Sequence, residues 1–220
     1  MVEAGYGYGD MPGINTLVQR AKIAEYVIWA VLGIFALVLV GELLEVAGVI
    51  DLDALQLDLL ASIYSLVLIA SSVVFLASVV VVCMWIYRAH ANLHELGHEG
   101  LEYTPGWAVG WYFIPIANLF KPFQAMRELW SESHSVADNF SDVAPGNLGL
   151  WWGMWIVGNI LGNISTRMYL FGDGSNQDVA LFLGIGSTIT TIGSAWILLQ
   201  IIRAVTAAQV AKTNLSEVFE

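Results

Sequence analysis

The chain has 220 residues, of which 57% are hydrophobic and only 12% are charged. That charged share is about half the share in an ordinary soluble domain. The formal net charge of −11 argues against nucleic-acid binding, which needs a basic surface. The single cysteine, Cys83, excludes an intrachain disulfide. Long uncharged runs take the place of a soluble core, so the composition predicts an all-α integral membrane protein.

Four long apolar segments are expected to cross a bilayer, which requires about 20 apolar residues in a helix. They lie at about residues 21–44, 59–87, 148–167 and 179–203. The N-terminus lacks the basic and short apolar regions of a cleaved signal peptide, so we expect the first helix to stay in the mature protein. We predict a single transmembrane helical domain over residues 21–206, preceded by a flexible arm (1–20) and followed by a polar tail (207–220).

The carboxylates of the first crossing stand near its ends. Glu25 lies close to its start, and Glu42 and Glu45 lie at its far end. We expect all three to reach water. The centres of the crossings then lack the ionisable group that ion or proton transport normally places in mid-membrane.

Between the second and third crossings lies a short aromatic stretch, residues 107–120. It is uncharged but has only 14 residues, too few for a comfortable crossing. Pro115 favours a broken helix, whose freed backbone groups need protein neighbours. Pro122 then suits the first turn of an amphipathic helix that lies in the interface. We predict a re-entrant or interfacial helical segment over residues 105–134, and a fifth full crossing is the alternative.

The distribution of Lys and Arg predicts the orientation. With four crossings and a cytoplasmic N-terminus, seven of the eight basic residues face the cytoplasm and only Arg167 lies outside. A fifth crossing would move Lys121 and Arg127 outside. We therefore expect both termini to be cytoplasmic, in a bacterial cytoplasmic membrane.

Tryptophans concentrate at the predicted inner interface. Seven of the nine are expected there: Trp85, Trp107, Trp111, Trp130, Trp151, Trp152 and Trp155. Some of these rings anchor helices at the level of the headgroups. Large aromatic side chains on a short kinked segment are also typical anchors of binding surfaces. We predict a surface that binds partner proteins or lipids, formed by Trp107, Trp111, Tyr112, Phe113, Phe123, Met126 and Trp130.

The third crossing carries small residues at helical spacing. Gly149, Gly153, Gly158 and Gly162 form two G-x-x-x-G pairs, which let helix backbones approach closely. Packing within one chain explains them as well as a dimer does. Asn159 and Asn163 are expected to donate hydrogen bonds to a neighbouring helix, and a ligand contact is the alternative.

Five motifs lie in and beside the aromatic stretch. They are W-x-Y-R-A (85–89), N-L-x-x-L-G (92–97), T-P-G-W-A-V-G-W (104–111), F-I-P-x-x-N-L (113–119) and K-P-x-x-x-M-x-E-x-W (121–130). On these motifs the chain resembles a bacterial membrane family known as domain of unknown function 4328. The resemblance implies a multi-pass helical membrane protein and assigns no activity.

The histidines are the candidates for a transition-metal or haem site, and the acidic residues between 42 and 58 are read as a solvated loop in preference to a cation site. His90 and His94 stand one helical turn apart, and Glu95 with His98 forms one E-x-x-H. The second E-x-x-H of a di-iron bundle is absent, as are nearby cysteine ligands. We expect solvated interfacial histidines, no metal and no cofactor.

No phosphate-binding loop, nucleophile elbow or H-E-x-x-H motif occurs in the sequence. We therefore expect a non-catalytic membrane scaffold or accessory subunit that contacts membrane lipids and a membrane-protein partner. Two alternatives remain: a small haem- or metal-binding redox protein that uses His90 and His94, and a transporter of a neutral substrate.

Overall fold

The computed structural model describes residues 12–52, 59–98, 100–134, 146–172 and 175–219, and these residues contain helices and no strand. The long helices are α1 (Pro12–Val46), α2 (Leu59–Glu95), α5 (Gly146–Phe171) and α6 (Gln177–Phe219). Four short elements connect α2 to α5: α3 (Pro105–Gly110), η1 (Trp111–Phe113), η2 (Ala117–Leu119) and α4 (Lys121–His134).

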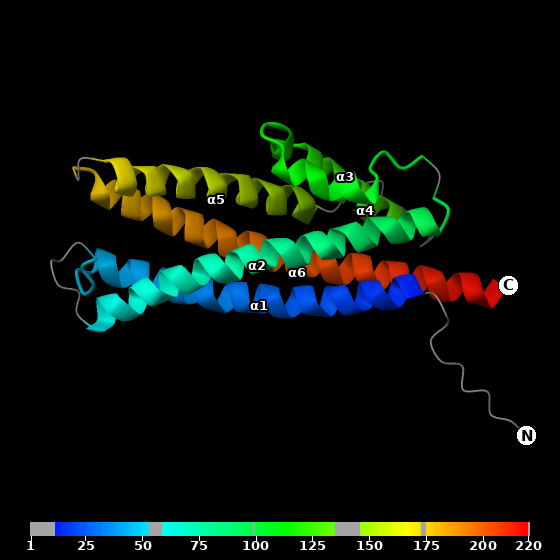
Figure 1. Cartoon of the computed structure of the whole chain (residues 1–220), viewed down its shortest axis with the longest axis horizontal. Helices are drawn as coiled ribbons and strands as arrows, with labels where there is room; N and C mark the ends of the chain where they lie inside the picture. Colours follow the sequence, from blue (N-terminus) through cyan, green and yellow to red (C-terminus); the bar gives the residue numbers. More distant parts are fainter. Residues whose placement is uncertain (1–11, 53–58, 99, 135–145, 173–174, 220) are drawn as a thin grey trace, which may run out of the picture.

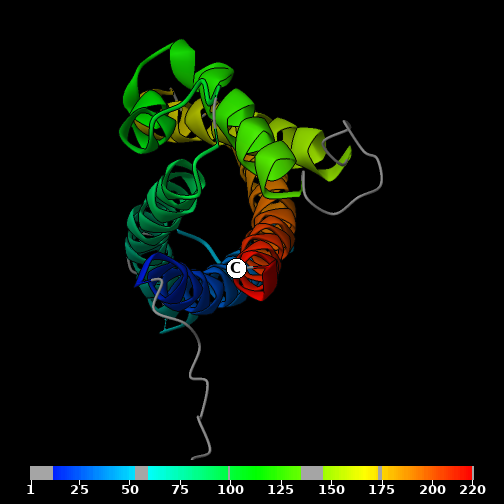
Figure 2. The ribbon, with the colours of Figure 1, turned by 90° about the vertical axis from the view of Figure 1, so that its right-hand side faces the viewer.

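The four long helices run along one common axis (Figure 1). α1 packs against α2 and α6, and α5 packs against α6. The start of α1 and the end of α6 lie at the same end of this bundle. The short elements pack over α2, α5 and α6 in that half of the molecule, and the end-on view shows them on one side of the bundle (Figure 2).

Three of the long helices are long and apolar enough to cross a membrane: α1, α2 and α6. This corrects the prediction of four crossings. The segment predicted at 148–167 does form a helix, α5, and its 26 residues are enough to span a bilayer. It contains five glycines, three asparagines and Arg167, and it is not among the three helices that are apolar enough to cross.

Two helices end at glycines with positive φ. α2 ends before Gly97 (φ 74°), where the Gly97 N–H donates to the His94 carbonyl and the His98 N–H donates to the Leu93 carbonyl. α1 ends in the same way at Gly48 (φ 69°). This bonding satisfies the last carbonyls of a helix and requires a left-handed residue, which glycine adopts without strain.

The helices extend beyond the segments predicted from the sequence. α1 begins at Pro12, within the predicted arm, and α6 continues to Phe219, through the predicted tail. Leu17 on the α1 extension is fully buried in the main hydrophobic cluster, and Gln209 on the α6 extension is also fully buried. Tertiary packing therefore stabilises helical turns for which the local sequence gives little signal.

Candidate functional site

Residues 105–134, which we call the platform, begin with a capped helix. The Thr104 hydroxyl accepts a hydrogen bond from the Trp107 N–H at 3.4 Å, and Pro105 occupies the first turn of α3. Proline fits there because its missing N–H has no partner within the helix. The ring of Trp107 then lies 4.9 Å from that of Trp111.

The platform is fixed to α5 by tryptophan. The Tyr112 ring meets Trp152 edge to face at 6.0 Å, and the Trp152 indole N–H donates to the Leu119 carbonyl at 2.8 Å. Trp152 in turn stacks on Trp155 at 4.6 Å. Burial raises the pKa of the Tyr112 phenol above its ordinary value of 10.0, so the phenol stays neutral.

A tight turn centred on Ile116 lies between η1 and η2. Ile116 has φ 69° and ψ −52°, and the Ala117 N–H donates to the Pro115 carbonyl at 2.8 Å. These features define a γ-turn with positive φ, which is rare and strained, above all for a β-branched residue. Such backbone strain amounts to about 1–3 kcal/mol and occurs most often at functional sites.

The same part of the platform exposes large apolar side chains. Ile116, at the tip of the turn, is 75% exposed, and Phe113 is 67% exposed. We call the exposed apolar residues of the platform the rim; they are Trp107, Phe113, Ile116, Leu119 and Phe120. An exposed apolar patch on a rigid support is typical of a contact surface for protein or membrane.

The other aromatic and apolar residues predicted for the contact surface lie deeper. Met126 is fully buried, and Trp111, Phe123 and Trp130 are half-buried against the main cluster. Trp130 also stacks on His134 at 4.2 Å. Met126, Phe123 and Trp130 thus hold α4 against the bundle, and the residues open to contact are those of the rim.

A set of polar groups holds the loop before α3 onto α4. The Glu128 carboxylate accepts hydrogen bonds from the backbone N–H groups of Glu102 (2.6 Å) and Tyr103 (3.1 Å). Lys121 Nζ lies 3.2 Å from Glu102 Oε1, and this interaction lowers the pKa of the exposed Glu102 carboxyl. Burial raises the pKa of Glu128. These groups line an open polar hollow of about 670 Å³.

Behind the platform, a fully buried amide joins three helices. Gln209 of α6 donates to the Ala89 carbonyl at 3.1 Å and to Ser133 Oγ at 2.9 Å, and it accepts from Asn92 Nδ2 at 3.3 Å. Close by, the indole N–H of the buried Trp85 donates to Thr206 Oγ1 at 3.1 Å. The buried polar side chains at this end, which we call the platform end, are thus paired.

His90 and His94 each bond to backbone carbonyl oxygens of the protein. His90 is buried, and its two ring nitrogens lie 3.0 Å from the Ile86 carbonyl oxygen and 3.3 Å from that of Ala125. This differs from the expectation of a solvated side chain, and its cause is the packing of α4 over α2. His94 Nε2 lies 3.0 Å from the Tyr103 carbonyl oxygen. In the part of the chain that the structure describes, no three His, Cys, Asp or Glu side chains are grouped as metal ligands.

The small residues of α5 divide into two pairs. A Cβ at Gly158 would lie 2.7 Å from Thr190 Oγ1, and one at Gly162 would lie 2.8 Å from Ser187 Oγ, so these two glycines allow α6 to approach closely. A Cβ at Gly149 or Gly153 would meet no atom within 4 Å among the residues that the structure describes. Within those residues, the second G-x-x-x-G pair is therefore the one that packs against another helix.

The side-chain amides of the two α5 asparagines donate within their own helix, where the sequence predicted hydrogen bonds to a neighbouring helix. Asn159 Nδ2 donates to the Trp155 carbonyl at 2.8 Å, and Asn163 Nδ2 donates to the Asn159 carbonyl at 2.8 Å. Both side chains are exposed on the outer side of α5, so each pairs with its own helix.

One polar residue was missed by the sequence analysis, which placed it in water. Glu42 is only 8% exposed. Its Oε1 accepts a hydrogen bond from Thr188 Oγ1 at 2.9 Å, and its Oε2 has no partner among the described residues. The one signal in the sequence was the row of small residues on the facing part of α6, which lets α1 come close.

Comparison with known proteins gives one match. A family described as domain of unknown function (DUF4328) matches residues 50–207, a range that includes α2, the platform, α5 and most of α6. No curated protein and no solved structure matches the chain.

Proposed function

The chain belongs to the DUF4328 family, and we propose that it is a non-catalytic membrane scaffold or accessory subunit that binds a membrane-protein partner through the rim of its platform. The observation that carries this proposal is the combination of exposed apolar side chains with a firmly anchored, strained turn. Ile116 and Phe113 are the most exposed members of the rim.

The proposed placement is a bacterial cytoplasmic membrane with both termini in the cytoplasm. Three helices have the length and apolar character to cross a membrane, and α5 lies alongside them. Charged groups meet at one level of the bundle: Arg203 pairs with Glu25 at 2.8 Å, and Arg20 donates to the Met84 carbonyl at 2.8 Å. We place the cytoplasmic interface at that level, because Lys and Arg favour the cytoplasmic side.

In this placement the platform is re-entrant or interfacial. Tyr112 packs on Trp152 of α5, so the chain that follows it runs beside the bundle. The rim would then lie in the inner leaflet, while Lys121 and Glu102 stay in the polar region outside it. A short broken helix can lie at membrane depth if neighbouring protein groups form hydrogen bonds with its free backbone groups. The Trp152 indole N–H does so at the Leu119 carbonyl.

The strained turn favours a protein partner over bulk lipid. Contact with lipid chains is non-directional and is satisfied by any apolar surface. The γ-turn fixes the position of Ile116 and so gives the rim a defined shape. A defined shape contributes to binding when the partner surface is complementary to it, as in protein–protein contacts.

Copurification in mild detergent tests the proposal. Trp107→Ala should remove a partner that purifies with the wild type in fixed ratio, because truncation of such an anchor costs about 2 kcal/mol or more, roughly a thirtyfold loss of affinity. The matched control is Trp196→Ala, since Trp196 is 47% exposed and Trp107 is 53% exposed, but Trp196 lies on α6 beside Trp29. The control should keep the partner.

Three results would contradict the proposal. The wild type could emerge with neither protein nor lipid bound in fixed ratio. A lipid bound in fixed ratio without protein would give the platform a lipid-binding role instead. Equal loss of partner in both tryptophan variants would show that the rim is not the contact surface.

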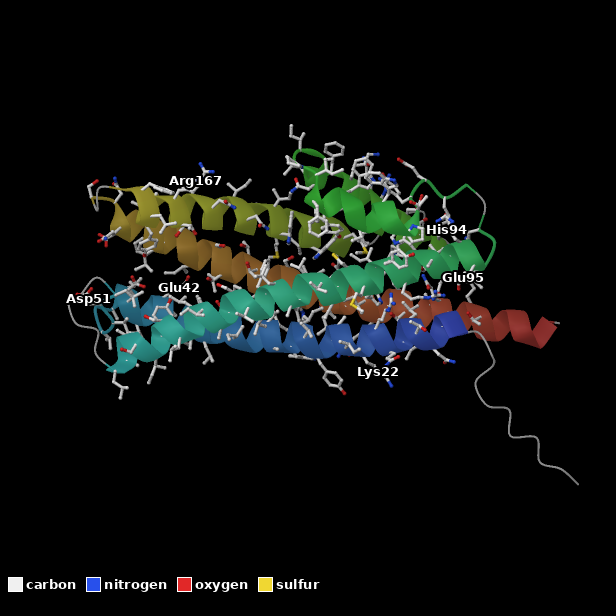
Figure 3. The ribbon with its side chains drawn as sticks, in the orientation of Figure 1. Lys22, Glu42, Asp51, His94, Glu95 and Arg167 are labelled. Carbon is white, nitrogen blue, oxygen red and sulfur yellow. The ribbon has the colours of Figure 1, made fainter. Side chains whose placement is uncertain are left out.

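The orientation has its own test, in a Cys83→Ser background. Asp51→Cys should react with an impermeant thiol reagent applied from outside, because Asp51 lies beyond the far end of α1 (Figure 3). Ile116→Cys should be protected from that reagent. Labelling of both positions from outside would rule out the placement of the platform on the cytoplasmic side.

A further inference from the structure

A second site surrounds Glu42, in the half of the bundle opposite the platform. Figure 3 shows Glu42 far along the bundle from His94 and Glu95. We call this region, with Glu42 and its neighbours Tyr64, Ser165, Gly184 and Thr188, the distal site. It draws on α1, α2, α5 and α6, and it is independent of the proposed contact function.

The distal site lies well inside the bundle. Thr188, the hydrogen-bond partner of Glu42, stands eleven residues after the start of α6 at Gln177. At a rise of about 1.5 Å per residue, that distance is about 16 Å along the helix. The pair formed by α5 and α6 therefore reaches beyond Glu42, and the carboxylate does not lie at an exposed helix end.

The walls of the site are close-packed. The Tyr64 ring lies against α1, since a Cβ at Gly41 would come within 2.0 Å of it. On the opposite side, a Cβ at Gly184 would meet both Glu42 Oε1 and Ser165 Oγ at 3.4 Å. The Ser165 hydroxyl is already used, because it donates to the Ala180 carbonyl at 2.7 Å.

Among the residues that the structure describes, no cationic side chain forms an ion pair with the carboxylate. In the part of the chain that the structure describes, the four ion pairs involve Arg88, Arg203, Lys121 and His98, and none of them includes Glu42. The titratable groups at the site are Glu45 from α1, which acts on Glu42 and Tyr64, Tyr64 from α2, and Tyr169 from α5, which acts on Tyr64. From α6, the Thr188 hydroxyl donates to Glu42. All of these groups are acidic or neutral.

An ionised carboxylate in such a place is very costly without a bound cation or a proton. Metal cations of the Ca²⁺ or Mg²⁺ type require about six oxygen ligands. Here the Thr188 and Ser165 hydroxyls direct their protons to Glu42 and Ala180. Ionisable groups at membrane depth commonly mark proton or ion sites.

We propose that Glu42 is a proton-binding site: the bundle holds it as a neutral carboxylic acid, with Oε1 as the carbonyl oxygen bonded by Thr188 and the proton on Oε2. Release of the proton leaves an unpaired charge between α1 and α6. Proton binding is therefore linked to the close packing of these two helices, and loss of the proton loosens that packing.

Infrared difference spectroscopy on the purified full-length protein tests this inference. The wild type at neutral pH should show the C=O stretch of a protonated buried carboxyl, and alkaline titration should remove it. Glu42→Gln should abolish the band. The matched control Glu45→Gln, one turn along the same helix, should keep it. Thr188→Val should move the band to higher frequency, because the carbonyl loses its hydrogen bond.

Three outcomes would overturn the inference: no such band at neutral pH, a band that persists in Glu42→Gln, or a band that sodium or potassium ions remove at constant pH. The last would assign the site to a metal cation. If Glu42→Gln does not accumulate, Glu42→Asp keeps an acid at the site and must shift the band. An unchanged band in Glu42→Asp would assign it to another residue.

Discussion

The platform end and the distal site treat buried polar side chains in opposite ways. At the platform end, the side-chain amide of Gln209 forms hydrogen bonds with Ala89 and Asn92 of α2 and with Ser133 of α4. At the distal site, one oxygen of the Glu42 carboxylate has none among the described residues. Satisfied buried polar groups fix a unique packing, whereas an unsatisfied one lowers stability and often has a functional reason. The difference suggests a rigid end for contact and a responsive end for ionisation.

The largest expected effect is at the platform end. Gln209→Leu should lower the free energy of unfolding in detergent by on the order of 3 kcal/mol, because Asn92, Ser133 and the Ala89 carbonyl all lose a buried partner. Gln200→Leu, on an exposed position of the same helix, is the control and should change little. An equal loss of unfolding free energy in both variants would show that the buried hydrogen bonds of Gln209 do not stabilise the platform end.

The next effect concerns the helix pair that connects the two ends. Gly158→Ala should destabilise the protein by about 2 kcal/mol, because the added methyl group meets Thr190 Oγ1 at 2.7 Å. The Thr190 hydroxyl is held by the Gly186 and Ser187 carbonyls and has little room to move. Gly149→Ala should leave stability unchanged or raise it, because the added methyl group meets no described atom within 4 Å. A neutral Gly158→Ala would mean that α5 and α6 do not pack this closely.

At the distal site, replacing the buried polar side chain with an apolar one should stabilise the protein, whereas the same kind of change at Gln209 should destabilise it. Glu42→Leu should raise the free energy of unfolding by about 1 kcal/mol, since it removes the unpaired oxygen and keeps a similar volume. The Thr188 hydroxyl can then bond the carbonyl one turn earlier in its own helix. The comparison fails if Glu42→Leu is as destabilising as Gln209→Leu under the same unfolding conditions.

The smallest effect is at the turn of the platform. Ile116→Gly should raise the free energy of unfolding by up to about 1 kcal/mol. Glycine adopts the positive φ without strain, which stabilises the folded state, but it also makes the unfolded chain more flexible, which offsets part of that gain. Ile114→Gly is the control, since Ile114 has an ordinary φ of −99° and no strain to relieve. A loss of stability in Ile116→Gly would show that the turn is not strained.

Much of the architecture follows from the pattern of uncharged residues. The long runs in α1, α2 and α6 predict helices that are long and apolar enough to cross a membrane, and Gly97 predicts the end of α2. The ends of α1 and α6 could not be predicted, because their outer turns depend on burial of residues such as Leu17 and Gln209 by other helices. Local sequence carries little information about such tertiary support.

The sequence predicted the location of the platform but not the burial of Glu42, because both outward-facing rings and buried carboxylates depend on how distant helices pack. Aromatic content identified the platform, but which rings face outward depends on how α4 packs, and that packing buries Met126. Glu42 stands at the end of its own apolar run, so its sequence position indicated water. The structure buries it because the α5–α6 pair extends past it, a relation between helices distant in the chain.

The contact function is tested most directly by photocrosslinking in intact cells. A photoreactive amino acid replaces Ile116 in one variant and Trp196 in another, and both positions are exposed, at 75% and 47% respectively. The account predicts one discrete protein adduct from position 116, absent at position 196 and weakened when Trp107→Ala is added. The same diffuse lipid labelling from both positions, with no discrete adduct, would contradict it.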